Sequence, residues 1–203
     1  MPEKKLIFGL GTGRCGTHSL RNLLNGQFDS FITHESGDIP LLPWVVDEQK
    51  IKQLLSVINK RKYMYVGDVS FYMLPYCEFI LKVYPDSKFI CLKRGKVDTV
   101  KSYCEKTQGR NHWQTHCGNK YKNCVWDKCY PKYNCNSKEE AIGLYYDDYY
   151  LTVESLADKY PNNIKILNMQ ELNTKNGVRS ILGFVGIPEE KMVVTTNVRV
   201  KAR

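Results

Sequence analysis

Apolar positions along the chain follow two alternating patterns. Five short runs, several of them apolar throughout, predict strands at residues 6–10, 30–33, 63–66, 88–92 and 164–167, and such runs are typical of strands covered on both faces. Between the runs, apolar residues recur with the i, i+3, i+4, i+7 spacing of amphipathic helices, as at positions 51, 54, 55 and 58. We expect helices to begin near Thr17, Asp47, Leu74, Lys96, Lys138 and Asn176.

This alternation predicts the α/β class: a three-layer sandwich with a central, mostly parallel sheet and helices on both faces. With 203 residues the chain can bury a substantial core, and we expect one domain over residues 1–203. The segment at about 104–137 breaks the rhythm, because it is polar, rich in cysteine and aromatic residues, and without periodicity. We interpret it as a long insertion between two core elements. The run YYDDYY, at 145–150, falls in a predicted helix, where we expect its rings to pack.

The first predicted strand runs into a glycine-rich loop, and a helical pattern follows. Residues 4–20 read KKLIFGLGTGRCGTHSL, with glycines at 9, 11, 13 and 16. A strand, a glycine loop and a helix start, in this order, are typical of phosphate binding, because backbone N–H groups at a helix N-terminus attract anions. The nature of the bound phosphate is less obvious.

Two interpretations of the loop come from common nucleotide-binding motifs. The stretch GTGRCG fits the G-x-G-x-x-G fingerprint of dinucleotide-binding folds, and Glu35 lies about where a ribose-binding acid would fall, roughly 20 residues on. Gly11 and Gly16 also have the spacing of a nucleoside-triphosphate P-loop, but Thr17 and His18 replace its lysine and its magnesium-binding hydroxyl. The first interpretation predicts an NAD(P)-dependent oxidoreductase, and the second a nucleotide kinase.

A third interpretation keeps the P-loop geometry and changes the nucleotide. Backbone N–H groups at the start of the helix can hold a single 5′-phosphate without a metal ion. The Arg14 side chain then supplies a fixed positive charge, and the hydroxyls of Thr17 and Ser19 add hydrogen-bond donors. The residues of this phosphate cradle are Arg14, Cys15, Gly16, Thr17, His18 and Ser19.

In this form the loop resembles that of a known family. TGRCGTHSL is similar to the 5′-phosphosulfate loop of the sulfotransferases, which use 3′-phosphoadenosine 5′-phosphosulfate (PAPS) as donor, although His18 stands where the family usually has Thr or Ser. FICLKRGKVDTVKSY resembles the family's 3′-phosphate segment, a strand that ends in Arg94 with Ser102 eight residues later. The stretches IKILNMQELN and VRSILGFVGIP resemble later structural elements of the family.

The resemblance implies a P-loop-like fold and an enzyme that moves a sulfuryl group from PAPS to an acceptor hydroxyl by in-line displacement. Such a reaction depends mainly on positioning and on charge stabilisation, and the resemblance implies no metal requirement. Arg14 would offset the charge that develops on the leaving phosphate, while Arg94 and Ser102 would bind the 3′-phosphate.

The acceptor hydroxyl also needs a base to take its proton. Glu35 follows the second predicted strand, where it resembles the catalytic Glu of the protein-tyrosine and heparan sulfotransferases. Asp68 aligns with the catalytic His of the small-molecule sulfotransferases, whose segment also runs on to Leu-Pro. We rank Glu35 first as the base, Asp68 second and His34 third.

The charge of the chain favours an anionic ligand. The formal net charge is +9, and residues 101–138 hold eight Lys or Arg against two acids, Glu105 and Asp127. Six aromatic residues are interleaved with these lysines, which suits a sugar, an acidic polymer or stacked bases. We favour PAPS and a hydroxyl-bearing acceptor such as a glycan over nucleic acid. A non-catalytic glycan- or nucleic-acid-binding module that uses this basic segment is a further alternative.

Five of the eight cysteines lie between residues 104 and 135, where they would be thiols or metal ligands in a reducing compartment and disulfides in an oxidising one. His112 and His116 lie among them, but no C-x2-C pair occurs, and we assign no metal site. The N-terminal apolar segment is too short for a secretory signal, and no run approaches the roughly 18 residues of a membrane span. We therefore expect a cytoplasmic protein that does not bind a membrane.

Overall fold

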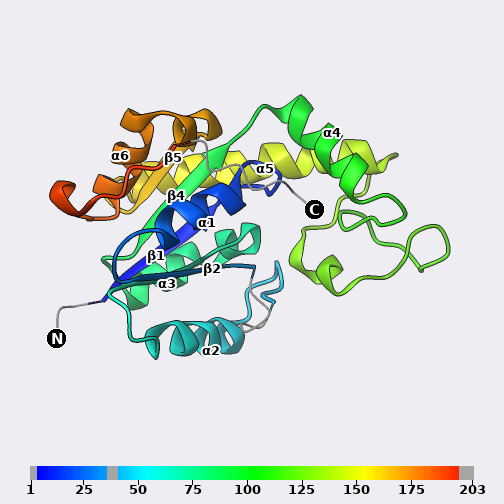
Figure 1. Ribbon diagram of the computed structural model, residues 1–203. Coiled ribbons are helices and arrows are strands. Elements are labelled where there is room, and N and C mark those ends of the chain that lie inside the picture. The colour runs from blue at the N-terminus through cyan, green and yellow to red at the C-terminus, as the bar shows by residue number, and fades with distance from the viewer. Residues whose placement is uncertain (1–3, 36–40, 197–203) are drawn as a thin grey trace.

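The computed structural model describes residues 4–35 and 41–196, which form a five-stranded, all-parallel sheet (Figure 1). The strand order is β2-β3-β1-β4-β5, so the first strand lies at the centre of the sheet. This arrangement confirms the predicted α/β class with a parallel sheet. The strands are β1 (Lys5–Leu10), β2 (Ser30–His34), β3 (Tyr65–Val69), β4 (Lys88–Lys93) and β5 (Ile164–Asn168).

Helices cover both faces of the sheet, as the three-layer prediction requires. On one face α1 (Thr17–Asn25) and α6 (Lys175–Phe184) pack against inward-facing strand residues in one hydrophobic cluster. On the other face α2 (Glu48–Asn59), α3 (Cys77–Val83) and α5 (Lys138–Lys159) build a second, larger cluster. The remaining helix, α4 (Lys96–Lys106), follows β4 and packs beside α5. Among the described helices, none is long and apolar enough to cross a membrane.

Side-chain caps explain where three of the helices begin. Asp47 accepts a hydrogen bond from the Lys50 amide at the start of α2, and Ser137 and Thr174 cap α5 and α6 in the same way. The helix expected near Leu74 begins later, because the chain first forms a 3₁₀ turn, η1 (Phe71–Tyr76), that contains Pro75. A proline cannot sit inside an α-helix without losing a backbone hydrogen bond, so α3 starts only after it.

The third strand is longer than the sequence predicts. We expected it over residues 63–66, but β3 extends to Val69 and includes Gly67 and Asp68. A Cβ atom at Gly67 would lie 1.6 Å from the carbonyl oxygen of Ile7 on β1, so glycine permits the close approach of the two strands here. Glycine and aspartate are poor strand formers in general, and this is why the hydrophobic pattern ended early.

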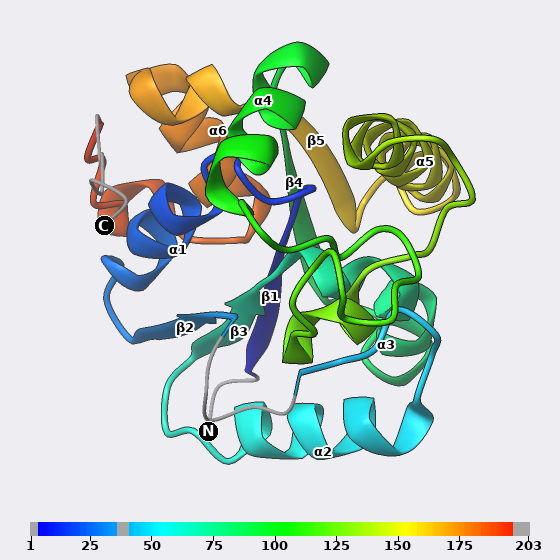
Figure 2. The same ribbon diagram turned by 90° about the vertical axis from the view of Figure 1, so that its right-hand side faces the viewer.

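The segment interpreted as an insertion is part of the protein core. It leaves α4 at Thr107, forms one 3₁₀ turn, η2 (Val125–Cys129), and returns to α5 in front of the carboxyl ends of the strands (Figure 2). Trp113 is fully buried, with its ring 4.8 Å from that of Tyr130, and Tyr130 stacks on Phe71 at 4.2 Å. These few large side chains attach the segment to the second hydrophobic cluster. The polar composition of the segment as a whole gave no indication of this burial.

Because Trp113 anchors the insertion in this cluster, we expect Trp113→Ala to lower the free energy of unfolding by about 3–5 kcal/mol. Lys120→Ala, at an exposed position of the same segment, is the matched control and should change it by less than about 0.5 kcal/mol. Urea unfolding followed by circular dichroism measures both. Equal, small effects of the two substitutions would mean that the insertion contributes nothing to the core.

Candidate active site

The glycine-rich loop joins the central strand β1 to α1 at the carboxyl edge of the sheet, where ligands bind in open α/β folds. Four loop residues have left-handed backbone angles: Gly11, Gly13, Gly16 and, unusually for a non-glycine residue, Arg14 with φ of 58°. Gly16 immediately precedes α1 and offers no side-chain cap, and the first turn, THSL, contains no acid. Neither a capping side chain nor an acid in the first turn therefore competes with an anion at this helix start.

Tyrosine hydroxyls from α4 and α5 hold the loop in this shape. Tyr149 accepts a hydrogen bond from the Gly11 amide at 2.9 Å and donates one to the Phe71 carbonyl at 3.1 Å. Tyr145 donates to the Thr12 carbonyl at 3.0 Å.

Tyr103 donates to that same Thr12 carbonyl. The Tyr103 hydroxyl also explains why residue 13 is glycine, since a Cβ atom there would lie 2.1 Å from it. Tyr150 donates to the carbonyl of Leu92, at the end of the neighbouring strand, at 2.8 Å. The rings of the YYDDYY run pack as expected, but sequence reasoning missed their hydroxyls, which no spacing pattern reveals.

The structure brings together the two phosphate motifs that are about 80 residues apart. Arg14 Nε donates to the Ser102 hydroxyl at 3.0 Å, and Arg94 donates to the Arg14 carbonyl at 3.0 Å. Arg94 also lies 4.0 Å from Asp98, and its own carbonyl accepts from Tyr146 at 2.7 Å. Two guanidinium groups and a hydroxyl thus lie beside the amides of α1.

The other cradle residues differ in what they present. Cys15 is fully buried beneath the loop, and burial raises the pKa of its thiol to about 11, so only its backbone faces a ligand. Thr17 is buried, and its hydroxyl lies 3.0 Å from His34 Nε2. His18 is exposed and Ser19 is half-buried, both on the first turn of α1.

Glu35 lies directly after β2, at the same edge of the sheet, with a left-handed φ of 45°. Its amide donates to the Val69 carbonyl at the end of β3, and this bond aims the residue across the carboxyl edge. The Glu35 side chain is 25% exposed. Burial and the neighbouring Asp68 carboxyl raise the pKa of Glu35 to about 8, although Arg14 acts in the opposite direction. At neutral pH the free protein therefore holds Glu35 mainly in its protonated form.

Asp68 lies on β3 and is fully buried. The Thr33 hydroxyl donates to one carboxyl oxygen at 2.6 Å, and the other oxygen has no hydrogen-bond partner among the described residues. Burial raises the pKa of Asp68, against the lowering effect of Thr33. Asp68 is thus an interior neighbour of Glu35 rather than a group that meets solvent.

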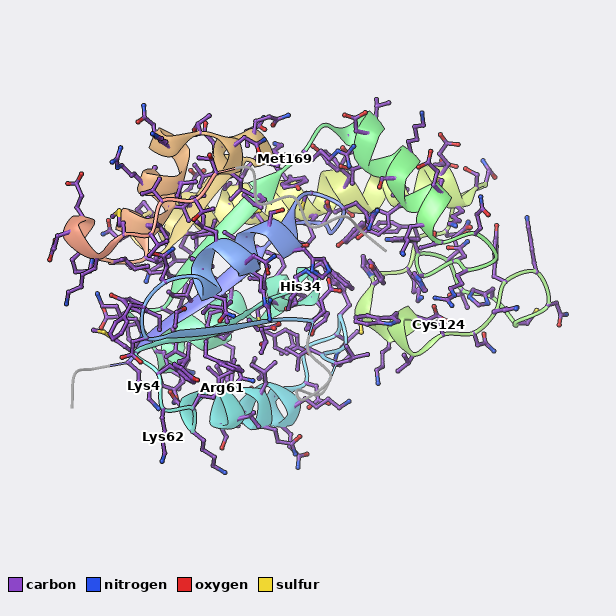
Figure 3. All side chains as sticks on the ribbon, in the orientation of Figure 1. Lys4, His34, Arg61, Lys62, Cys124 and Met169 are labelled. Atoms are coloured by element: carbon purple, nitrogen blue, oxygen red, sulfur yellow. The ribbon has the colours of Figure 1, made fainter. Side chains whose placement is uncertain are left out.

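His34 lies at the end of β2, beside the start of α1 (Figure 3). Its Nδ1 atom lies 4.0 Å from Glu35 Oε2, and its other ring nitrogen contacts Thr17. The His34 ring stacks on His18 with centroids 3.8 Å apart. Burial lowers the pKa of His34 to about 4, and His18 and Arg21 contribute in the same direction.

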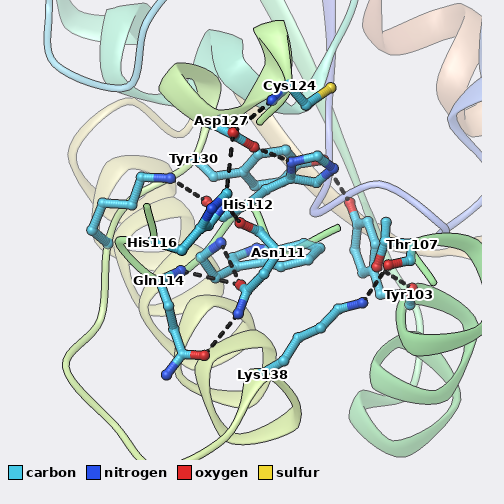
Figure 4. Close-up of polar contacts among 12 residues, drawn as sticks. Tyr103, Thr107, Asn111, His112, Gln114, His116, Cys124, Asp127, Tyr130 and Lys138 are labelled. Carbon is cyan, nitrogen blue, oxygen red and sulfur yellow. Dashed lines mark hydrogen bonds and ion pairs between the residues drawn. The ribbon is translucent and has the colours of Figure 1, made fainter. Parts of the chain in front are cut away.

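The cysteines and histidines of the insertion serve structural contacts. His112 Nδ1 lies 2.6 Å from Asp127, and His116 lies 3.0 Å from the Asn111 carbonyl oxygen (Figure 4). All eight cysteines are free thiols. Within residues 4–35 and 41–196, no group of three His, Cys, Asp or Glu side chains has an arrangement that could hold a metal ion.

A glycine loop that joins the central strand to the N-terminus of a helix defines the P-loop-like class of α/β phosphate-binding proteins. Within this class a family model described as sulfotransferase domain matches residues 6–188, and the chain belongs to that family. A search of curated proteins finds no match. The family implies a PAPS-dependent transferase and confirms the resemblance seen in the motifs. It decides against the kinase and oxidoreductase interpretations of the loop.

If the tyrosine hydroxyls hold the loop, Tyr149→Phe should lower the free energy of unfolding by about 1–3 kcal/mol, since the Gly11 amide and the Phe71 carbonyl lose their buried partner. Tyr63→Phe is the control, because Tyr63 is 41% exposed and should tolerate the change within about 0.5 kcal/mol. Chemical unfolding measures both variants, and equal losses in their free energy of unfolding would contradict this role of Tyr149.

Proposed function

We propose that the chain transfers a sulfuryl group from PAPS to an acceptor hydroxyl, with the 5′-phosphosulfate held by the loop and the first turn of α1. The observation that carries this proposal is the cluster of Arg14, Arg94 and Ser102, which hydrogen bonds connect beside the α1 amides. These residues fit the donor because its two phosphate groups need two separate sets of cationic and polar partners.

In this proposal the loop amides and the Thr17 and Ser19 side chains bind the 5′-phosphate, and Arg94 and Ser102 bind the 3′-phosphate. Arg14 lies between the two sets, since it contacts Ser102 through its side chain and Arg94 through its carbonyl. Its guanidinium group would stabilise charge on the leaving phosphate, as a metal ion does in an ATP site. We therefore propose donor binding that needs no metal.

The reaction we propose is an in-line displacement at sulfur. The acceptor oxygen forms the new S–O bond, while the bond between sulfur and the bridging oxygen breaks and its electron pair remains on the phosphate of 3′-phosphoadenosine 5′-phosphate (PAP). The acceptor proton passes to the Glu35 carboxylate. With a pKa near 8, the ionised Glu35 carboxylate is a stronger base than an ordinary carboxylate. The raised pKa therefore suits this step once Glu35 is ionised.

The environments of the three candidate bases support Glu35. It is the candidate with both a partly exposed side chain and a raised pKa. Asp68 is closed off from solvent, so an acceptor could reach it only if neighbouring groups moved aside. His34 has a pKa of about 4 and is a weak base at neutral pH. We place Asp68 as a neighbour that raises the pKa of Glu35.

The identity of the acceptor rests on the insertion. The aromatic faces that we expected to meet a sugar are partly internal, because Tyr103, Trp113 and Tyr130 are buried. Tyr121 and Trp126 remain partly exposed, and exposed cations accompany them at Arg110, Lys120, Lys122 and Lys128. We propose a hydroxyl on an anionic biomolecule, with an acidic glycan as the first class to test.

Binding of PAP, measured by isothermal titration calorimetry in the presence of EDTA, tests the donor assignment. We expect binding without metal, no comparable affinity for ADP–Mg or NADPH, and a loss of roughly ten- to a hundredfold in Arg94→Ala. Arg110→Ala removes an exposed cation of the insertion and should bind PAP as the wild type does. Preference for ADP–Mg, or equal binding by both variants, would overturn the assignment.

Once an acceptor is found, Glu35→Gln should lower kcat/KM by about 10²- to 10⁴-fold. The wild-type rate should rise with pH and level off above about 8, because Glu35 accepts a proton only in its ionised form and is protonated below that pH. Glu48→Gln, on the exposed side of α2, is the control variant. A Glu35→Gln enzyme with near-normal activity and the same pH profile would exclude Glu35 as the base.

A further inference from the structure

The two stacked histidines at the phosphate loop have no role in the reaction as proposed above. His18 lies on the first turn of α1, exposed, while His34 lies at the end of β2, half-buried. Their rings are 3.8 Å apart and inclined by 23° to each other, and His34 contacts the Thr17 hydroxyl. The pair is therefore built into the loop that receives the donor phosphate.

The surroundings keep this pair uncharged in the free protein. Burial, Arg21 and Arg14 lower the pKa of His18, and burial, His18 and Arg21 lower that of His34. Among the described residues, Glu35 is the acid that faces the pair, and its own raised pKa leaves it mainly protonated at neutral pH. An imidazole that stands alone takes up a proton near pH 6.5. Burial and nearby arginine charge lower the pKa of both rings, and the contact with His18 lowers that of His34 further, so protonation needs a lower pH.

A bound phosphate reverses this balance. Its oxygens at the α1 amides would lie on the same turn as His18 and would offset the charges of Arg14 and Arg21. The rings are too close for both to be protonated easily, but one shared charge is stabilised by the anion. His18 is the better position for it, because it is exposed while His34 is enclosed.

We propose that the His18–His34 stack takes up one proton when the 5′-phosphate binds, with the charge on His18, so that the stack acts as a proton-linked phosphate receptor. This inference rests on the proposed binding of the donor at the loop. It gives a physical role to His18, the residue that departs from the family pattern. Thr or Ser at this position could donate a hydrogen bond but could not take up a proton.

The sign of the pH dependence follows from the linkage. The complex binds more protons than the free protein at any pH between the lowered His18 pKa of the free protein and the higher pKa in the complex. Affinity for PAP therefore rises as pH falls through this window, by up to about tenfold per pH unit for one proton. Below the free-protein pKa of His18 the stack is already charged, and this contribution to the pH dependence ends.

Calorimetry with PAP measures the proton directly. The intact protein is titrated with PAP at pH 7 in cacodylate and in Bis-Tris, two sulfonate-free buffers, and the dependence of the observed enthalpy on buffer ionisation enthalpy gives the protons taken up. We expect an uptake that approaches about one proton per PAP in the wild type. His18→Phe keeps an aromatic ring on His34 without a titratable nitrogen, and His18→Thr restores the usual family residue.

Both variants should bind PAP, and both should lose most of the uptake. Proton uptake or release common to all three proteins belongs to groups other than His18, such as Glu35 and the phosphate groups of PAP, which titrate near pH 6. Equal uptake in the wild type and in both variants would overturn the role of the stack, as would the absence of any uptake in a wild-type protein that binds PAP. A wild-type protein that does not bind PAP would instead refute the proposed donor site, and circular dichroism of each variant confirms that it is folded.

Discussion

The structure depends on one constraint: the backbone must turn sharply between the central strand β1 and the start of α1. Arg14 takes a left-handed conformation there that is costly for a residue with a side chain, and such a loop persists only if its surroundings fix it. Here the surroundings are buried tyrosine hydroxyls from α4 and α5, which bond to the Gly11 amide and the Thr12 carbonyl. The long helix α5 thus fixes the shape of the glycine-rich loop.

The same burial that stabilises the fold sets the electrostatics of the site. The pairing of β2 with β3 brings Glu35 close to Asp68 at the carboxyl edge of the sheet, and burial raises the pKa of both carboxyl groups. Burial also lowers the pKa of the nearby His34 to about 4. Arg14 and Arg94 lie at the same edge, and their fixed positive charge favours an anionic donor.

Arg14 links the phosphate loop to the chemistry of the site. Its side chain reaches Ser102 on α4, its carbonyl accepts from Arg94 after β4, and its charge opposes the raised pKa of Glu35. A donor that binds beside Arg14 would change the protonation of every titratable neighbour. We therefore propose that donor binding and proton chemistry are coupled at this site.

Much of this was determined by the sequence alone, because the relevant signals are local. Short apolar runs predicted all five strands, the periodicity of apolar residues predicted the starts of most helices, and the order of strand, glycine loop and helix predicted a loop suited to phosphate. Only the tertiary structure decided which distant groups meet. The hydroxyls of Tyr145 and Tyr149, the stack of His18 on His34 and the pairing of Glu35 with Asp68 join separate elements, and no local pattern encodes such contacts. The burial of Trp113 could not be predicted from the sequence either. A few large side chains suffice to bring a polar segment into a core, whereas a periodic pattern needs many apolar residues to be recognised.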